Sequence, residues 1–249
     1  MAIPAEVLLF PSDDAVPDAF AALRLTFIVP VYNEGATVVQ VLDRVNGLPC
    51  EKQIIVVDDG STDGTAEVLA AWSAREGGLV IRQPNRGKGA AIRAAIPHVD
   101  GDIVVIQDAD GEYDPIDVPR LVEPIARGAA DVVFGSRLSG GQPQRAHMFW
   151  HLVGNRFLSL LTNVLFNTTL SDMETGYKVF RADVLRSLDL REDRFGIEPE
   201  ITGKICKQRC RIYELPIAYY GRSYSEGKNI TWKDGFRAIG VLLAVRLKG

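Results

Sequence analysis

The sequence predicts an α/β protein in three layers, with helices on both faces of a mostly parallel central sheet. Short apolar, β-branched segments at residues 54–57 and 103–106 have the composition of strands buried on both faces of a sheet. Segments with helical periodicity alternate with such strands, as in a parallel sheet built from strand–helix units. At 249 residues the chain is long enough for one large domain of this kind.

The chain divides into three parts. Residues 1–23 are rich in Ala, Pro and Asp without a sustained period, and predict an N-terminal arm. Residues 24–228 carry the strand–helix alternation and predict the α/β domain. Residues 229–249 predict a C-terminal amphipathic helix. That helix suits either the headgroup region of a membrane or a place against the protein core, and the sequence leaves both open. Its apolar and basic residues include Trp232, Lys233, Phe236, Arg237, Ile239, Leu242, Leu243, Arg246, Leu247 and Lys248.

Composition and charge narrow the classes of protein. The net charge of −4 is a weak argument against a nucleic-acid partner, which requires a basic face. No apolar run approaches the roughly 18 residues needed to cross a bilayer. Three cysteines and no basic residue before Arg24 argue against a secreted protein with a signal peptide, so we expect a reduced cytoplasmic setting. Cys206 and Cys210 are interpreted as packing residues of a helix.

An acidic stretch directly follows the strand at residues 103–106. Ligands of open α/β sheets bind outside the carboxyl ends of the strands. Asp108 and Asp110 are separated by one residue, so both can face one divalent cation, with Glu112 as a third oxygen donor. Like charges raise each other's pKa, and a cation stabilises such a group. A solvated turn is the alternative. A calcium-binding EF-hand is excluded because Ile106 would be its first ligand.

Polar residues also follow the first two strands. Pro30 cannot donate to a ladder, so the first strand should stop near it. The next residues place an aromatic ring, an amide and a carboxylate in a loop. These side chains could bind a nucleoside base and ribose, or the segment could be an ordinary strand-to-helix turn. After the second strand, carboxylates can accept from a base or ribose, while Asp63 suits a helix cap. These candidates for substrate binding are Pro30, Tyr32, Asn33, Glu34, Val57, Asp58 and Asp59.

The later part of the chain adds basic residues and a second polar cluster. Lys88 and neighbouring glycines lie at a helix start, where phosphate can bind. The fifth strand ends at Arg137, and Asp172 with Glu174 lies between two apolar segments, as general bases or as loop caps. Arg222 and Lys228 lie in a glycine-flanked loop, which composition alone would interpret as a solvated turn.

Four motifs stand on successive strand–helix units. They are Val29-Pro30-Val31-Tyr32-Asn33-Glu34, residues 56–65 with Asp58-Asp59-Gly60-Ser61, Asp108-Ala109-Asp110, and Gly135-Ser136-Arg137. In this order the chain resembles the family 2 glycosyltransferases of the GT-A fold. Within that family it resembles the dolichyl-phosphate (polyprenyl-phosphate) mannosyltransferase-like branch. The resemblance covers roughly residues 25–248.

The resemblance implies roles for these residues. Pro30, Tyr32, Glu34 and Asp59 would hold the base and ribose of a nucleotide-sugar. Asp108 and Asp110, flanking Ala109 and joined by Glu112, would hold Mg²⁺ or Mn²⁺ on its diphosphate. Arg222 and Lys228 match a basic pair that acts on the leaving diphosphate, and Arg137 matches a contact to an acceptor phosphate. A second arginine is usual in the following helix. The chain has His151 there, flanked by Arg145 and Arg156.

The function implied by the resemblance is an inverting hexosyl transfer. The donor would be a nucleotide-diphospho-sugar of GDP-mannose or UDP-glucose type, and the acceptor a polyprenyl phosphate of dolichyl type. We expect peripheral contact with the inner face of the cell membrane. A hydroxyl acceptor, soluble or on a glycan, is the alternative, and would need a general base such as Asp172, Glu174 or Glu198. A non-enzymatic nucleotide-sugar binding module is a third possibility, against which Asp108, Asp110, Arg222 and Lys228 argue.

Overall fold

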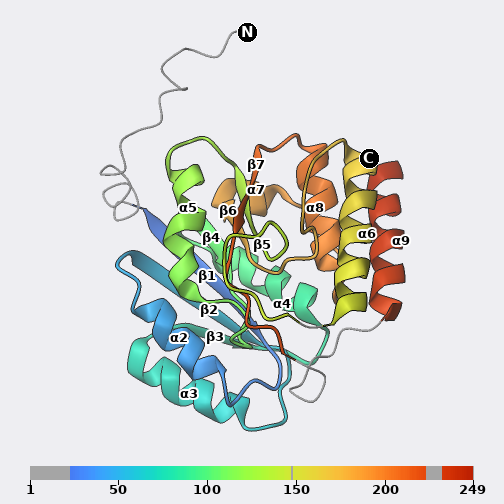
Figure 1. Ribbon diagram of the computed structural model, residues 1–249. Coiled ribbons are helices and arrows are strands. Elements are labelled where there is room, and N and C mark those ends of the chain that lie inside the picture. The colour runs from blue at the N-terminus through green and yellow to red at the C-terminus, as the bar shows by residue number, and fades with distance from the viewer. Residues whose placement is uncertain (1–22, 147, 223–231, 249) are drawn as a thin grey trace.

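A seven-stranded sheet forms the centre of the protein (Figure 1). The computed structural model describes residues 23–146, 148–222 and 232–248, so the predicted N-terminal arm and Lys228 lie outside the described residues. The sheet has the order β3-β2-β1-β4-β6-β5-β7. The strands are β1 Arg24–Val31, β2 Glu51–Asp58, β3 Leu79–Arg82, β4 Ile103–Ile106, β5 Val132–Ser136, β6 Lys178–Arg181 and β7 Ile212–Pro216. Only β6 is antiparallel to its neighbours β4 and β5.

Helices cover both faces of the sheet, which confirms the three-layer prediction (Figure 1). One buried cluster joins the sheet to α2, α3 and α5, and another joins it to α4, α7 and α8. The helices are α2 Val38–Asn46, α3 Thr65–Glu76, α4 Lys88–Ala95, α5 Val118–Ala126, α6 Phe149–Phe166, α7 Ala182–Ser187, α8 Ile197–Lys207 and α9 Trp232–Leu247, with 3-10 turns η3 Ile96–His98 and η4 Pro115–Asp117.

The last helix, α9, packs against α6 and α8 on one side. Ala238 and Leu242 are buried in a small cluster with Leu158 and Met173. The described part of α9 therefore contributes to the core through one side. Phe236 and Leu247, in contrast, are 69% and 82% exposed. No helix of the described residues is both long enough and apolar enough to cross a bilayer.

The end of β1 agrees with the sequence prediction. The strand was expected to stop near Pro30, and it ends at the next residue, Val31, with Pro30 opposite Val57. The hydrogen bond from Gln107 N to Ile28 O shows that Ile28, and hence Pro30 two residues later, turns its backbone polar groups toward β4. Because β4 already ends at Ile106, the missing N–H of Pro30 leaves no ladder bond unmade.

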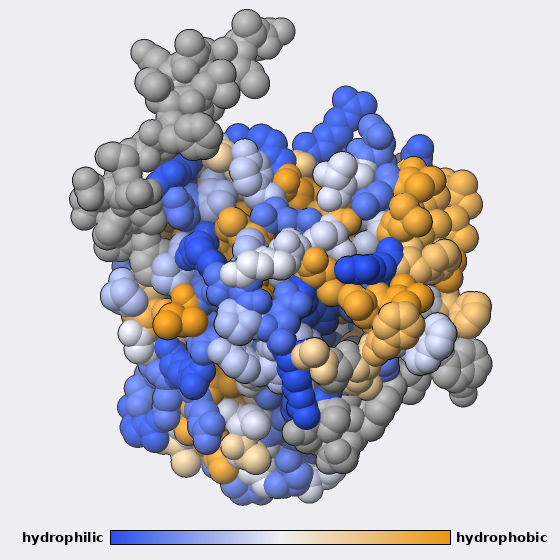
Figure 2. All heavy atoms as spheres, in the orientation of Figure 1, coloured by the Kyte–Doolittle hydropathy of each residue, from blue (hydrophilic) through white to orange (hydrophobic). Residues whose placement is uncertain are grey.

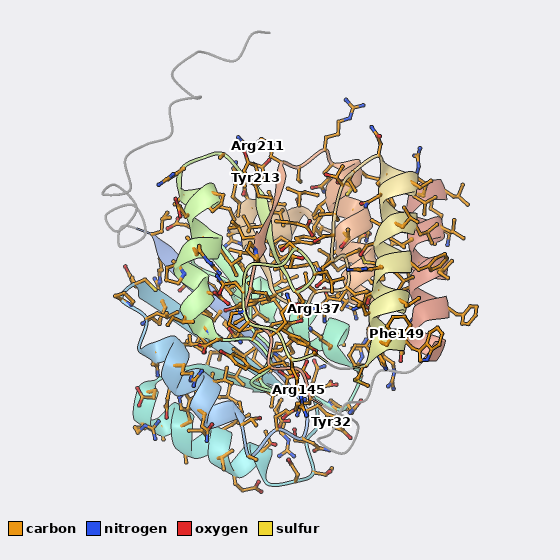
Figure 3. The ribbon with its side chains drawn as sticks, viewed as in Figure 1. Tyr32, Arg137, Arg145, Phe149, Arg211 and Tyr213 are labelled. Atoms are coloured by element: carbon orange, nitrogen blue, oxygen red, sulfur yellow. The ribbon has the colours of Figure 1, made fainter. Side chains whose placement is uncertain are left out.

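The parallel strands finish at one end of the molecule. Tyr32 follows β1, and Arg137 follows β5, so both side chains lie at this end together with Arg145 (Figure 3). Arg211 and Tyr213, at the start of β7, lie at the opposite end (Figure 3). The fold thus separates a polar end that carries the predicted site from an end that carries the starts of the parallel strands and the end of β6.

Asp131 joins three strands at that opposite end. Its two carboxylate oxygens accept hydrogen bonds from the backbone and guanidinium of Arg211, just before β7, and it pairs with Arg181 at the end of β6. Hydrogen bonding by the Arg211 side chain is the main cause that lowers the pKa of Asp131 to about 2. The ionised carboxylate therefore stabilises the sheet.

We predict that Asp131→Asn lowers the free energy of unfolding at pH 7 by about 1–2 kcal/mol. The effect is no larger because Arg181 and Arg211 are half-exposed, so that solvent screens their attraction to Asp131. Because the pKa of Asp131 is lower in the folded than in the unfolded chain, its ionised carboxylate stabilises the folded protein above about pH 4. This stabilisation is lost as the pH falls toward 2. Thermal unfolding at pH 7, 4 and 2.5 should therefore show the variant and the wild type converge. Asp183→Asn, at an exposed partner of Arg181, is the control and should change stability by no more than about 0.5 kcal/mol. A difference that persists unchanged to pH 2.5 would contradict the assignment.

Candidate active site

Two carboxylates after β4 face two cations of the chain. Lys88 Nζ lies 2.7 Å from Oδ1 of Asp108. Arg222 Nη2 lies 3.1 Å from Oδ2 of Asp110, and Glu112 N donates to the other oxygen of Asp110. Burial, followed by the charges of Asp108 and Glu112, raises the pKa of Asp110 to about 7. The ionised form of Asp110 is thus disfavoured first by burial and then by the neighbouring carboxylates.

Glu112 is turned away from the pair and toward the segment after β7. Its Oε2 accepts from the hydroxyl of Tyr219 at 2.8 Å, and its Oε1 accepts from Arg222 N at 2.6 Å. Its backbone oxygen accepts from Tyr220 N. Glu112 therefore fastens residues 219–222 to the loop after β4 and so positions Arg222 next to Asp110.

The residues present fit a divalent cation on Asp108 and Asp110. Among the described residues, no group of three or more His, Cys, Asp or Glu side chains is placed to hold a metal ion. Glu112 is bonded here to Tyr219 and Arg222, and its role as a third ligand stays a prediction. Two carboxylates suffice for Mg²⁺ or Mn²⁺ when water and a substrate phosphate complete the coordination. The donor chemistry of Asp108 and Asp110 is of that kind.

The loops after β1 and β2 are bonded to each other. Asn33, with φ of 55°, accepts from Thr62 N through Oδ1 and donates its own N–H to Ser61. Asn is among the residues that tolerate this left-handed conformation best. Asp58 is buried and accepts from Ser61 N. Asn33 and Asp58 therefore shape the loops, while the ring of Tyr32 is 44% exposed at their edge.

Asp59 and Glu34 hold basic segments in place. Asp59 Oδ1 accepts from Gln83 and from Arg86 N, and its Oδ2 accepts from Gly87 N at 2.6 Å. These bonds fix the loop that leads into α4 and Lys88. Glu34 pairs with Arg222, with Oε1 and Nη2 2.8 Å apart. Three further predicted residues lie at or just after strand ends, where these loops begin: Pro30, Val57 and Ala109. The side chains of Val57 and Ala109 are buried.

A chain of buried charges continues behind Lys88. Sequence reasoning named Glu198 only as a possible general base and missed Lys178. Lys88 Nζ lies 3.1 Å from Glu198 of α8, and Glu198 lies 2.5 Å from the fully buried Lys178 of β6. Asp108 and Glu198 raise the pKa of Lys88 although burial opposes its charge. A signal existed in the sequence, because a lysine between the apolar residues of a buried strand requires a carboxylate partner. A Cβ at Gly176 would lie 2.5 Å from Asp108 Oδ2, so a larger residue there would have to displace the carboxylate of Asp108.

Arg137 contacts Tyr219, a residue that lines an open hollow. Its guanidinium makes two bonds to the fully buried Asp172, and its carbon lies 5.3 Å above the ring of Tyr219. Tyr219 also lines the hollow of about 420 Å³, together with Pro143, Gln144, Arg145 and Tyr220. Arg145 donates to Gly221 O at 2.9 Å. His151 and Arg156 lie further along, on α6.

The three carboxylates predicted as general bases differ in their partners. Asp172 is held by two nitrogens of Arg137, and Glu198 lies between two lysines. Glu174, in contrast, has a buried Oε1 with no hydrogen-bond partner among the described residues. Burial, followed by the charge of Glu198, raises the pKa of Glu174 to about 7. Of the three, Glu174 has the availability and the pKa of a proton acceptor near neutral pH.

Comparison with known proteins points to one family. The model of glycosyl transferase family 2 matches residues 26–189. The low-salt glycan biosynthesis hexosyltransferase Agl6 of Haloferax volcanii is 30% identical over 242 residues, which cover 96% of this chain and 56% of that protein. The undecaprenyl-phosphate mannosyltransferase of Micrococcus luteus is 31% identical over 220 residues, which cover 83% of this chain and 87% of that protein. The chain thus spans little more than half of the first relative and most of the second.

A solved structure shares the fold. Glucosyl-3-phosphoglycerate synthase of Mycobacterium tuberculosis, in complex with Mn²⁺, UDP and phosphoglyceric acid, superposes with a TM-score of 0.73 at 23% identity, covering 94% of this chain and 82% of that one. This likeness confirms the GT-A fold that the sequence predicted. The expectation of a glycosyltransferase is confirmed by the family match over more than half of the chain. With its sheet, its motifs in order and these relatives, the chain belongs to glycosyltransferase family 2.

Proposed function

We propose that the protein transfers a hexose from a metal-bound nucleotide-diphospho-sugar to a polyprenyl phosphate, with inversion at the anomeric carbon. The observation that carries the donor half is the Asp108–Asp110 pair with Lys88 and Arg222 beside it. Carboxylates for a divalent cation and cations for phosphate oxygens meet at the ends of the strands. The Mn²⁺ and UDP of the mycobacterial synthase support this assignment, although that protein shares only the fold.

The chemistry breaks the bond between the anomeric carbon and the diphosphate. An oxygen of the acceptor phosphate forms the new bond from the opposite face of the sugar, and the nucleoside diphosphate leaves with the electron pair. Lys88 and Arg222 stabilise the negative charge that develops on the leaving group. Arg222 is held ready by Glu34 and Glu112. A bound Mg²⁺ or Mn²⁺ supplies further stabilisation of that charge. Lys228 keeps its predicted role on the diphosphate and lies outside the described residues.

Three observations support a phosphate acceptor. Arg137 lies at the end of β5 and is held by Asp172 and Tyr219 beside the hollow. An ionised phosphate needs no general base. The relative from Micrococcus luteus bears the name of an undecaprenyl-phosphate mannosyltransferase. The donor sugar is glucose or mannose, and the donor base is uracil or guanine.

A hydroxyl acceptor is the second candidate, and Glu174 is the observation that favours it. A hydroxyl must lose a proton as it attacks, and the unpartnered oxygen of Glu174 can take it. Such an acceptor would be a soluble molecule or a glycan. The two candidates differ in whether Glu174 takes part.

A donor screen tests the proposed function. Radiolabelled GDP-mannose, UDP-glucose and related nucleotide-sugars are incubated with the protein, Mn²⁺ and polyprenyl phosphate. We expect label from one donor to enter an organic-soluble product, and Asp110→Asn to lower turnover at least 100-fold with an unchanged far-ultraviolet circular dichroism spectrum. Asp183→Asn, at the opposite end of the sheet, is the matched control and should retain activity. Label that enters only water-soluble products, or undiminished turnover in Asp110→Asn, would overturn the proposal.

Glu174→Gln separates the two acceptor classes. With a phosphate acceptor the variant should keep its turnover within about threefold, because no proton has to be removed. With a hydroxyl acceptor it should lose about 10²–10⁴-fold. In that case the wild-type rate rises as pH rises through about 7, where Glu174 becomes ionised, and the variant lacks this rise. The measurement is a pH–rate profile of both proteins with the acceptor found in the screen.

The exposed face of α6 supports contact with a lipid surface. Large apolar side chains lie along it at helical spacing, and Phe157 and Val164 are 55% and 74% exposed. Figure 2 shows apolar side chains gathered over the part of the surface where Figure 1 places α6 and α9. Exposed Arg156, Arg237 and Arg246 on the same two helices complement an anionic bilayer. We call this surface the α6 face; its members are Phe149, Trp150, Val153, Phe157, Leu160 and Val164.

The α6 face should bind anionic liposomes. Each large apolar side chain contributes about 1.5–3 kcal/mol when it leaves water, so Phe157→Glu with Val164→Glu should lower liposome binding at least tenfold. Thermal stability should hold, because both positions are exposed. Raised salt should release part of the wild-type protein, since screening weakens its basic residues. Ile116→Glu, at an exposed apolar residue next to α2, is the control in co-sedimentation. Equal sedimentation of the double variant and the wild type would exclude this face.

A further inference from the structure

Each of the two cations beside the Asp108–Asp110 pair has a second carboxylate partner outside that pair. Lys88 contacts Asp108 at 2.7 Å and also lies 3.1 Å from Glu198. Arg222 contacts Asp110 at 3.1 Å and Glu34 at 2.8 Å. The side chain of Lys88 is only 16% exposed, so a lone charge there would be costly. The second partner means that Lys88 can give up Asp108 without becoming an unpaired buried charge.

We propose that Lys88 occupies Asp108 in place of the metal until a diphosphate arrives, and that Glu198 is the positioning residue that keeps Lys88 at the site during the exchange. This inference rests on the proposed function and deepens it by assigning the order of contacts at the same site. Both oxygens of Asp108 lie within 3.0 Å of Lys88 Nζ, so a cation must compete with Lys88 for them. Phosphate oxygens provide Lys88 with a new partner and thereby free Asp108.

The buried pair behind Glu198 explains why Glu198 can do this. Lys178 is fully buried, lies 2.5 Å from Glu198 Oε2 and donates to the backbone oxygen of Met173 as well. Glu198 is therefore fixed on one side by Lys178 and offers its other oxygen to Lys88. Lys178 and Lys88 hold the pKa of Glu198 below its ordinary value although burial opposes this. Lys88 swings between partners while Glu198 stays in place.

The consequence is a coupling between metal and diphosphate that depends on Lys88. In the wild type, Mn²⁺ alone must displace Lys88 from Asp108. When a diphosphate is also present, Lys88 contacts its phosphate oxygens, and Asp108 is free to bind Mn²⁺. Removal of the Lys88 charge should therefore strengthen the binding of Mn²⁺ alone and weaken that of the diphosphate. These opposite signs distinguish an exchanging cation from a structural ion pair, whose loss would weaken both.

The test measures Mn²⁺ binding by electron paramagnetic resonance, with and without UDP or GDP, in the full chain. In Lys88→Met we expect Mn²⁺ alone to bind at least fivefold more tightly and the nucleoside diphosphate at least fivefold more weakly, a coupling of ordinary size. Lys204→Met removes a lysine that pairs with Glu200 on the same helix as Glu198 and touches no carboxylate of the site. As the matched control, it should change neither constant.

A second set of variants tests Glu198. Lys178→Met with Glu198→Gln removes both charges of the buried pair, which keeps the interior charge balanced and the chain folded. Lys88 then depends on Asp108 alone, so Mn²⁺ alone should bind at least fivefold more weakly. Adding Lys88→Met should restore that binding, which loss of structure would not allow. Failure of this rescue would overturn the role of Glu198.

Failure of the inference is distinct from failure of the proposed function. If wild-type protein binds Mn²⁺ together with UDP or GDP but Lys88→Met binds Mn²⁺ alone no more tightly, the exchange is wrong and the donor site stands. If none of the proteins binds Mn²⁺ under either condition, the proposed donor site itself is wrong, and the inference falls with it.

Discussion

The ion pair between Lys88 and Asp108 is the interaction on which the rest of the site depends. It links the start of α4 to the end of β4, and through Glu198 it continues to α8 and to Lys178 of β6. Four elements far apart in the sequence are thus held by charges that water barely reaches. Loss of one member is unfavourable, because a buried charge without a partner costs several kcal/mol. The site and the core are therefore one structure at this point.

Much of the fold was predictable because it depends on local patterns. Buried parallel strands read as continuous apolar runs, and the motifs that follow β1, β2 and β4 lie where strand ends must place them. The polar end of the sheet, with Asp108 and Asp110 together, follows from those rules. The antiparallel β6 could not be foreseen in the same way, because its four residues pair with β4 and β5 through contacts that no local pattern records.

The partners of individual side chains were the least predictable part. Glu112 stands where a third metal ligand was expected, yet Tyr219 and Arg222, more than 100 residues later in the chain, take both of its oxygens. Glu198 and Lys178 find each other through helix packing on the sheet, which spacing in the sequence cannot express. In each case the partner comes from a distant segment of the chain, and a single sequence does not show which segments pack together.

In the sheet, β6 lies between β4 and β5 and so separates β1 to β4 from β5 and β7. The proposed donor side is shaped mainly by the loops after β1, β2, β3 and β4, and Arg222, after β7, joins it from late in the chain. Segments after residue 137 supply α6 and most of the hollow, while Gly176, Glu198 and Arg222 reach back to the side of Asp108 and Asp110. Changes to the segment between β5 and β6 can therefore alter the hollow and α6 while the contacts of Lys88 with Asp108 and of Arg222 with Asp110 are kept.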